Sequence, residues 1–282
     1  MTAQIQPLAG TVVTLESDAA RTHTYSAPED SLFVNSHVIE TEHALVLLDG
    51  QLMKGYAAEF ANYVESLGKP VERLILSHVH PDHFAGLPVI LDRLPGTEVH
   101  ALAQIKQYLD ANAAVILENR AGVVGDALDG RTPIISKVLP VGEEVIDGLT
   151  YRFAHLHDAE SQHSLLIELP QLGTTVPVDV VFRNEYHLFT TGPYFDPWTE
   201  VLVGLRGRLG SAERLLVGHG APSDPSEIDG NIAYLAEAKA IHAEAADHEQ
   251  YAEQLKAAFP ERGKTGAWVD FSSLVLYGLL NP

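Results

Sequence analysis

The order of apolar and helical segments predicts an α/β fold in which two β-sheets pack face to face and helices cover their outer faces. Two observations support this prediction. The first half of the chain alternates short apolar runs with helical segments, and the second half begins with strand-like runs before it becomes helical. A chain with this order can bury both sheets in one layered domain. A length of 282 residues is long for an average domain but suits a single sandwich.

In the first half, apolar runs between turn residues mark the strands, and glycine and proline mark helix ends. Gly68 and Pro70 follow one helical segment in the usual stop pattern, and Asp49-Gly50 forms a turn after a strand. The expected elements are two strands within residues 31–50, the second at 45–48, a helix over 55–67, a strand over 73–77, a helix over 84–94, a short strand over 99–101 and a helix over 102–120.

The second half is expected to begin with strands and to end with helices. One helix has clear start signals, because Asp196 is a preferred N-cap residue and Pro197 suits the first helical position. The expected elements are strands over residues 149–156, 165–169 and 175–182, a helix over 197–209, a strand over 214–217, and one broken or two consecutive helices over 228–259.

Composition narrows the possible partners. The chain has 38 acidic and 18 basic residues, a formal charge of −20, and no dense basic patch, so we expect no binding to nucleic acid. The absence of cysteine removes disulfides, thiolate ligands and cysteine nucleophiles. The first residues lack both a positive segment and a long apolar stretch, which predicts no signal peptide and no membrane anchor. The expected compartment is the cytoplasm, and the expected partner is a small-molecule substrate.

Residues 78–83 carry the strongest functional signal. They read His-Val-His-Pro-Asp-His and directly follow the apolar strand segment at residues 74–76. Imidazole nitrogens and a carboxylate oxygen are donors that zinc and similar divalent ions accept. His78 and His80 alternate along an extended chain and can point to one side, while the acid and histidine that follow turn toward the other. The segment therefore predicts a site for one or two metal ions.

This segment resembles a known signature. The string SHVHPDHFAG is similar to the H-x-H-x-D-H loop of the metallo-β-lactamase superfamily, and the resemblance covers roughly residues 30–222. It implies the αββα sandwich of that superfamily, two mixed sheets with outer helices. We expect residues 1–282 to form one domain, with residues 223–282, which lie outside the resemblance, as a helical C-terminal extension.

Two distant residues match later ligand positions of the superfamily. His219, in the string LLVGHGAP, follows an apolar strand and resembles the final ligand motif. Asp179 follows the apolar string TTVPV and matches the carboxylate that bridges two ions. An unpaired charge in such apolar surroundings costs several kcal/mol, and a metal ion would supply the partner. A buried salt bridge to Arg183 is the alternative.

The third ligand departs from the usual pattern. Where the superfamily has G-H-T-P-G-S before a strand, this chain has Ala-Glu-Ser-Gln-His-Ser at residues 159–164. Aligning the serine and the strand places Glu160 at the histidine position, as in alkylsulfatase-type members. The alternatives for this ligand are His155, His157 and His163. Asp49 matches an aspartate that braces the metal loop, although it also fits a simple Asp-Gly turn.

The resemblance implies a dinuclear hydrolase. One metal site is expected from His78, His80 and Glu160, the other from Asp82, His83 and His219, with Asp179 bridging them. The ions are expected to be two Zn²⁺, with Mn²⁺ or iron as alternatives, and a bridging hydroxide available at neutral pH would attack the substrate. The substrate is expected to be a small ester, lactone, thioester, sulfate ester or phosphate ester. Asp82 is also a candidate catalytic residue, and His187 is a candidate substrate contact or general acid.

Two other functions on the same fold stay open. One is an iron-dependent oxidoreductase, and the other is a non-catalytic member that binds metal without turnover. Three roles also stay open for the acidic C-terminal helices and the apolar segment 271–280: packing on the sandwich, covering the site, or forming a homodimer contact.

Overall fold

The computed structural model describes residues 8–210 and 213–280. Its strands are β1 (Thr11–Glu16), β2 (Arg21–Ser26), β3 (Asn35–Glu40), β4 (Leu45–Leu48), β5 (Val71–Leu76), β6 (Val99–Ala101), β7 (Lys137–Val138), β8 (Gly142–Ile146), β9 (Leu149–His157), β10 (His163–Leu169), β11 (Thr174–Val178) and β12 (Arg214–Val217). Its α-helices are α1 (Lys54–Ser66), α2 (Pro81–Phe84), α3 (Leu87–Arg93), α4 (Ala103–Val124), α5 (Phe195–Arg208), α6 (Glu227–Glu244), α7 (His248–Ala258) and α8 (Gly266–Leu276). Short 3-10 turns occupy Glu29–Ser31, Gly125–Ala127, Pro170–Leu172 and Pro260–Arg262.

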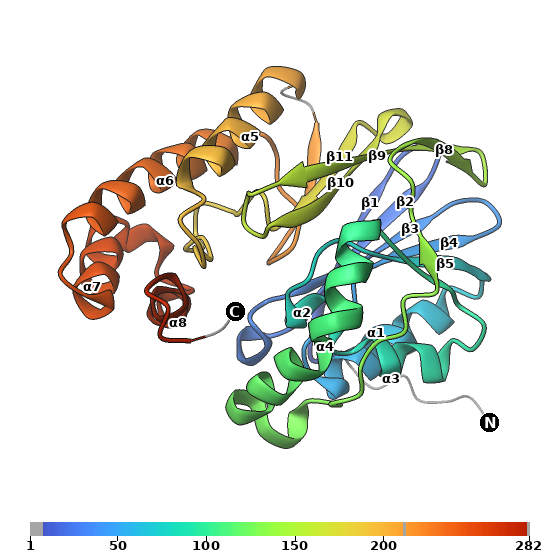
Figure 1. The fold of residues 1–282 in the computed structure, drawn as a ribbon. Coiled ribbons are helices and arrows are strands. Elements are labelled where there is room, and N and C mark those ends of the chain that lie inside the picture. Colours follow the sequence, from blue (N-terminus) through green and yellow to red (C-terminus); the bar gives the residue numbers. More distant parts are fainter. Residues whose placement is uncertain (1–7, 211–212, 281–282) are drawn as a thin grey trace.

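Two mixed sheets form the centre of the fold, and helices lie outside them (Figure 1). One sheet has seven strands in the order β1-β2-β3-β4-β5-β6-β7, and the other has five in the order β12-β11-β10-β9-β8. In the larger sheet β1 to β4 pair antiparallel and β4 to β7 pair in parallel. In the smaller sheet β11 pairs in parallel with β12, and the other neighbours pair antiparallel. The predicted sandwich of two mixed sheets is confirmed.

Two hydrophobic cores hold the layers together. The larger core fills the space between the sheets and includes Leu74 and Leu165. The smaller core lies between the five-stranded sheet and the C-terminal helices and includes Leu166, Trp198 and Tyr234. Adjacent residues on β10 thus enter opposite cores, as expected for a strand that is buried on both faces. The C-terminal helices pack on the sandwich, and no helix in the described part of the chain is long and apolar enough to cross a membrane.

The helix predicted over residues 84–94 is α3, which begins only at Leu87, because Phe84 still belongs to the separate short helix α2. Gly86 lies at the break, where its N–H donates to Gln51 O at 2.6 Å. A Cβ at this position would lie 2.7 Å from both Gln51 O and the Cβ of Ala57. The chain therefore approaches the start of α1 so closely that only glycine fits at the break.

Two other predicted boundaries were wrong. The strand predicted over residues 175–182 ends at Val178, which has a φ of +46°, and the chain turns there into a buried apolar loop. An apolar run therefore marks burial but does not separate a strand from a buried loop. Tyr194 is the N-cap residue of α5, and Asp196 lies within its first turn. Asp196 remains in a favourable position, because a carboxylate in the first turn faces the positive end of the helix dipole.

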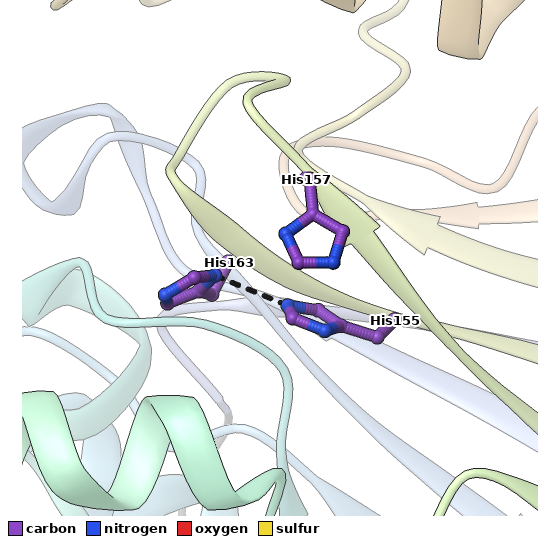
Figure 2. Close-up of side chains that lie close together, drawn as sticks. All are labelled: His155, His157 and His163. Carbon is purple, nitrogen blue, oxygen red and sulfur yellow. Dashed lines mark hydrogen bonds between the residues drawn. The ribbon is translucent and has the colours of Figure 1, made fainter.

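Backbone hydrogen bonds join the two sheets at the edge where the candidate ligands lie. The N–H of Leu165, on β10, donates to Ser77 O just after β5 at 2.8 Å. The N–H of Asn35, on β3, donates to Gly218 O just after β12 at 2.7 Å. These bonds fix the positions of loops from both sheets relative to one another. At the same edge β9 and β10 carry three neighbouring histidines, His155, His157 and His163 (Figure 2).

Candidate metal centre

The loop after β5 carries four of the candidate ligands. The strand ends at Leu76, and α2 begins at Pro81, a residue that suits the first helical position. His80 keeps an extended backbone before the helix, whereas Asp82 and His83 lie within it. This change from extended to helical backbone lets neighbouring side chains diverge, as the spacing of the loop predicted.

The structure brings all the predicted ligands together in two buried groups. Within each group the ligand atoms lie within 4.8 Å of one another, and Asp179 belongs to both groups. One group contains His78, His80, Glu160 and Asp179, and the other contains Asp82, His83, Asp179 and His219. Two ligand groups that share one carboxylate have the arrangement needed for a pair of neighbouring ions.

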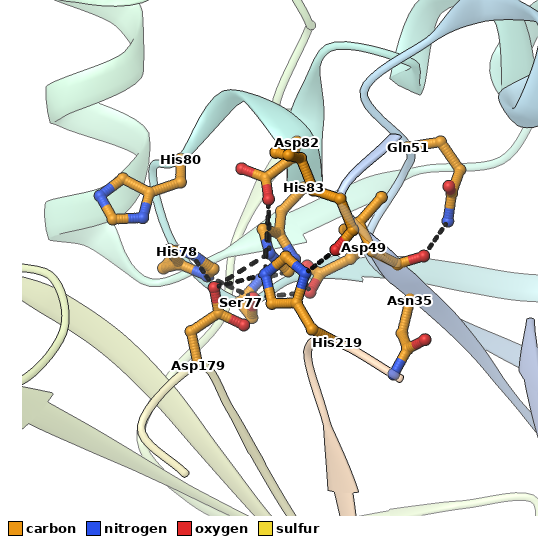
Figure 3. Close-up of polar contacts among 12 residues, drawn as sticks. Asn35, Asp49, Gln51, Ser77, His78, His80, Asp82, His83, Asp179 and His219 are labelled. Carbon is orange, nitrogen blue, oxygen red and sulfur yellow. Dashed lines mark hydrogen bonds and ion pairs between the residues drawn. The ribbon is translucent and has the colours of Figure 1, made fainter. Parts of the chain in front are cut away.

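Asp179 lies at the centre of the histidines (Figure 3). Its Oδ2 atom is 3.2 Å from His219 Nε2, 3.3 Å from His83 Nε2 and 3.6 Å from His78 Nε2. On the outer side of the second group, Asp82 Oδ2 is 3.5 Å from His219 Nε2. The alternative of a salt bridge between Asp179 and Arg183 is excluded, because that arginine pairs with Glu185 at 2.9 Å.

Glu160 occupies the third ligand position. It lies between β9 and β10, with Oε1 2.8 Å from His80 Nδ1 and Oε2 3.8 Å from His78 Nε2. The alternatives form a group of their own that contains His155, His157 and His163. The fold therefore places Glu160, the residue that the sequence alignment favoured, in the cluster with the other candidate ligands.

Hydrogen bonds behind the imidazoles determine which nitrogen faces the cluster. Asp49 Oδ2 accepts from His83 Nδ1 at 2.9 Å and from Ser77 Oγ at 2.7 Å, and Asp49 Oδ1 accepts from Ser77 N at 2.8 Å. Because Ser77 Oγ donates to Asp49, it accepts from His78 Nδ1 at 2.9 Å. Both histidines thus direct Nε2 into the cluster, where a metal ion would take the place of any proton on that atom. Asp49 makes the contacts expected of a residue that braces the loop.

The glycine before His219 leaves room for the central carboxylate. A Cβ on Gly218 would lie 1.6 Å from Asp179 Oδ1, so any other residue would displace that carboxylate. The Nδ1 atom of His219 donates to Leu32 O at 2.8 Å, which leaves Nε2 facing Asp179. The Gly-His string therefore supplies both a ligand and the space that its neighbour needs.

Several buried polar atoms of the cluster have no hydrogen-bond partner. They are His78 Nε2, His83 Nε2, Asp179 Oδ1 and Glu160 Oε2, whereas Glu160 Oε1 has a partner in His80 Nδ1 at 2.8 Å. Each unpaired buried polar atom costs about 1–3 kcal/mol. A divalent cation would be the partner of all of them, since imidazole nitrogen and carboxylate oxygen are its usual protein donors. These residues therefore fit a pair of divalent ions.

The pKa values of the cluster are shifted because its ionisable groups are buried next to one another without a cation. Burial, together with the charge on His83, lowers the pKa of His78 well below its ordinary value. Burial alone would lower the pKa of His83, but nearby carboxylates, Asp179 foremost, raise it well above that value. Burial raises the pKa of Glu160 to about 7. These opposite shifts show charges held in a low-dielectric pocket where a bound cation would balance the carboxylates.

A cavity of about 430 Å³ opens onto the cluster. Its polar floor includes the candidate ligands His80, Asp82, Asp179 and His219. The rest of its wall is mostly apolar and comes from the loops after β2 and β4, the end of α4, the loop before α5, and α8. The cluster is thus accessible to a small molecule while most of its surroundings exclude water.

Helix α8 covers one side of this cavity, so the C-terminal segment both packs on the sandwich and covers the site. The ring centroid of Trp268 is 4.6 Å from that of His219, and the ring of Phe271 stacks on Phe189 at 5.8 Å. The guanidinium of Arg120, at the end of α4, lies 4.8 Å from the centre of the Phe271 ring. No sequence pattern marks Arg120 or Trp268 as a site residue, and the apolar character of the C-terminal segment is the only sequence signal for α8.

His187 is the one candidate catalytic residue that the structure does not bring to the cavity. Its side chain is 1% exposed, and its Nδ1 lies 3.1 Å from the hydroxyl of Tyr234. Its backbone N–H donates to Thr265 Oγ1 at 2.6 Å, and the residue does not line the cavity at the cluster. Burial, assisted by Arg262, lowers the pKa of His187 to about 4. The geometry therefore supports a packing role, and the suggestion that His187 contacts substrate finds no support.

The fold and the cluster together define an α/β sandwich that carries a buried metal-ligand cluster. The sequence matches the model of the metallo-β-lactamase superfamily over residues 30–219, a segment that contains every candidate ligand. The chain therefore belongs to the metallo-β-lactamase superfamily, and its hydrolase fold retains an intact ligand cluster.

Solved structures share this fold. A metallo-β-lactamase from Pontibacter korlensis superposes with a TM-score of 0.64 at 15% identity, over 80% of this chain and 99% of that one. The metallo-β-lactamase FIM-1 from Pseudomonas aeruginosa, in its mono-zinc form, superposes with a TM-score of 0.60 at 15% identity, over 84% of this chain and 99% of that one. A curated relative, the uncharacterized protein YobT of Bacillus subtilis (strain 168), is 32% identical over 66 residues, which span 23% of this chain and 28% of YobT.

Proposed function

We propose that the protein is a metal-dependent hydrolase that uses two divalent ions, Zn²⁺ foremost, to cleave a small ester-type substrate. The observation that supports this most directly is the pair of buried ligand groups that share Asp179 beneath an open cavity. Two ions bound there would polarise a substrate oxygen and lower the pKa of water to about 7, which makes hydroxide available at neutral pH.

The residues at the site have three roles: holding the ions, carrying a proton and excluding water. The first ion would be held by His78, His80 and Glu160, the second by Asp82, His83 and His219, and both by Asp179. Asp82 also lines the cavity, so its carboxylate is placed to hold a proton destined for the leaving group. On the side of α8, Trp268 and Phe271 exclude water and so strengthen the electrostatic interactions inside.

Glu160 sets the charge of the centre. Two divalent ions (+4) with Asp82, Asp179 and Glu160 (−3) leave a net charge of +1, one unit less than with histidine at the third position. An additional oxygen donor makes the first site more tolerant of Mn²⁺ or iron. Because histidine nitrogens remain in the majority, we keep Zn²⁺ as the expected ion.

The wall of the cavity favours a substrate with an apolar body and an anionic group. Arg120 is half-buried beside Phe271 and forms no side-chain hydrogen bond or ion pair among the described residues. Burial lowers the pKa of Arg120, opposed by the charge of Asp82, but a guanidinium stays protonated in proteins. An unpaired guanidinium on an apolar wall binds carboxylate or sulfate well. We therefore propose an apolar ester that carries one such group a short distance from the scissile bond.

Metal analysis combined with ester hydrolysis tests the reaction. We expect about two ions per chain, ester cleavage that chelation abolishes, and recovery of cleavage when Zn²⁺ is returned. Iron in the purified protein, together with oxygen consumption and no ester cleavage, would favour the oxidoreductase and contradict the hydrolase. If the protein binds about two ions per chain but cleaves none of the esters tested, the result would favour a non-catalytic member.

A pair of esters with the same aryl leaving group tests the substrate class. One acyl group is butyryl, and the other is the glutaryl half-acid, which adds a carboxylate. Arg120→Gln should raise KM for the glutaryl ester about 10-fold or more, since a charged hydrogen bond contributes about 1.5–3 kcal/mol, and should leave the butyryl ester nearly unchanged. Arg131→Gln, on the exposed surface, is the control. Equal effects of Arg120→Gln on both esters would contradict the anion site without affecting the hydrolase.

A further inference from the structure

A second group of histidines lies outside the buried cluster, at the end of the hairpin formed by β9 and β10 (Figure 2). His163 pairs directly opposite His157 in the antiparallel register, and Leu165 pairs opposite His155. Directly opposed residues project to the same face of a sheet, as do residues two apart on one strand. The three imidazoles therefore share one face because of strand geometry alone.

The nitrogens of this group are spaced as the ligands of one metal ion are. His155 Nε2 lies 3.1 Å from His163 Nδ1, and one nitrogen from each of the three rings falls within 4.8 Å of the others. Zinc–nitrogen bonds of about 2.0–2.1 Å in a tetrahedral site place two nitrogens roughly 3.3 Å apart. The closest pair thus already has the required separation, and rotation of the exposed His157 side chain would bring in the third nitrogen.

The environment of the group favours neutral imidazoles with available lone pairs. Burial, and then the charges of His157 and His163, lower the pKa of His155 to about 4. Burial, with the charge of His157, also lowers the pKa of His163. A metal ion therefore displaces few protons at neutral pH when it binds here.

We propose that His155, His157 and His163 form a third metal site, separate from the buried pair, that binds one borderline transition ion such as Zn²⁺, Co²⁺ or Ni²⁺. Three nitrogen donors without a carboxylate select such ions over Mg²⁺, Ca²⁺ or Mn²⁺. Three protein ligands also leave a fourth position for water or an anion.

The position of this site connects it to the buried cluster. His163 and His80 line the same small cavity of about 130 Å³, together with Tyr108 of α4. His157 is exposed, whereas the side chains of the buried ligands are almost inaccessible. An ion at the third site therefore lies at the surface, beside a cavity that reaches a ligand of the first buried site.

Cobalt titration of the metal-loaded protein tests the proposal, because tetrahedral Co²⁺ absorbs visible light strongly. Two equivalents of Zn²⁺ per chain, and no excess, first fill the buried pair, where carboxylates and fixed rings bind the ions more tightly, so that added Co²⁺ reports on the remaining site. We expect one additional Co²⁺ per chain with tetrahedral absorption bands in the wild type. His157→Gln should weaken this binding at least tenfold, and His163→Gln should do the same.

His43→Gln is the matched control, since His43 is an exposed histidine on another turn. It should leave the cobalt signal unchanged. A wild type that binds no further Co²⁺, or one whose additional ion is weakened equally by His43→Gln and His157→Gln, would overturn the proposal. Retained Zn²⁺ content and ester hydrolysis in His157→Gln would show that the variant is folded and that the third site is distinct from the buried pair.

Discussion

The two histidine groups of this protein offer the same donor atom in different settings. The buried cluster combines imidazoles with carboxylates and is held between the ends of strands from both sheets. The group on β9 and β10 contains imidazoles alone, belongs to one hairpin and is partly exposed. Close spacing of nitrogens therefore does not by itself distinguish a reactive centre from a surface site.

The difference lies in the support behind each ring. In the buried cluster Asp49, Ser77 and Leu32 O fix the Nδ1 atoms of three of the four imidazoles, so that their Nε2 atoms are directed inward. In the exposed group the one polar contact between side chains is that of His155 with His163. Fixed rings hold ions in a defined geometry, whereas movable rings bind an ion without orienting it toward a substrate. We therefore expect the two groups to respond very differently to substitution.

Asp179→Asn should have the largest effect, because both buried groups depend on this side chain. The substitution removes the single negative charge that both sites share and leaves one amide oxygen where two carboxylate oxygens could bridge the ions. Ester hydrolysis should fall about a thousandfold or more, since the ions supply several kcal/mol of transition-state stabilisation. The measurement is kcat/KM with metal content on the same preparation. Asp229→Asn, on the surface, should be neutral, and an active Asp179→Asn enzyme with both ions bound would contradict the bridging role.

Local sequence patterns predicted most of the buried cluster because most of its residues lie in short strings. The loop from His78 to His83 and the Gly218-His219 pair each follow an apolar strand, and strand ends are where a sandwich places its loops. The clearance that Gly218 provides for Asp179 was not predictable, because it depends on a contact between loops that are far apart in the sequence.

Other features depend on tertiary contacts that no local pattern encodes. The strands β1 and β2 carry few long apolar side chains, and β2 is buried through polar pairs such as His23 with Glu40. Arg120 gains its position because the end of α4 meets α8, a helix more than 140 residues later. The position of His187 was not predictable for the same reason, since this histidine follows the central aspartate in sequence but packs against Tyr234, away from the cavity.

Glu160→Gln should have the next largest effect on hydrolysis. It also gives the most direct test of whether the buried cluster and the exposed histidine group bind ions independently. Because Glu160 and His163 lie within three residues of each other, a generally damaged hairpin would affect both groups. We expect the ion content of the buried cluster to fall from about two to about one and hydrolysis to fall roughly 100-fold, with the third site unaffected.

The same variant should change the pH dependence of metal binding. Burial raises the pKa of Glu160 to about 7 in the metal-free cluster, so an ion must displace a proton there when the pH is below that value. Affinity in the wild type should therefore fall as the pH drops from 7 toward 5, and Glu160→Gln should remove part of that slope. Calorimetric titration with Zn²⁺ at two pH values measures how the affinity depends on pH. The same pH dependence in Glu160→Gln as in the wild type would exclude Glu160 as the group that releases the proton.

Asp49→Asn should have the smallest of these effects, because Asp49 orients ligands without contacting an ion. The asparagine amide can still accept from Ser77 N, but it no longer offers a second carboxylate oxygen to both Ser77 Oγ and His83 Nδ1. Metal affinity or hydrolysis should fall about 10–100-fold, the range seen when a group behind a metal ligand is removed. Competition with a chelator of known affinity measures the loss. A variant with unchanged affinity and activity would show that burial alone orients His83, and support behind the rings would then no longer explain why the buried and exposed groups differ.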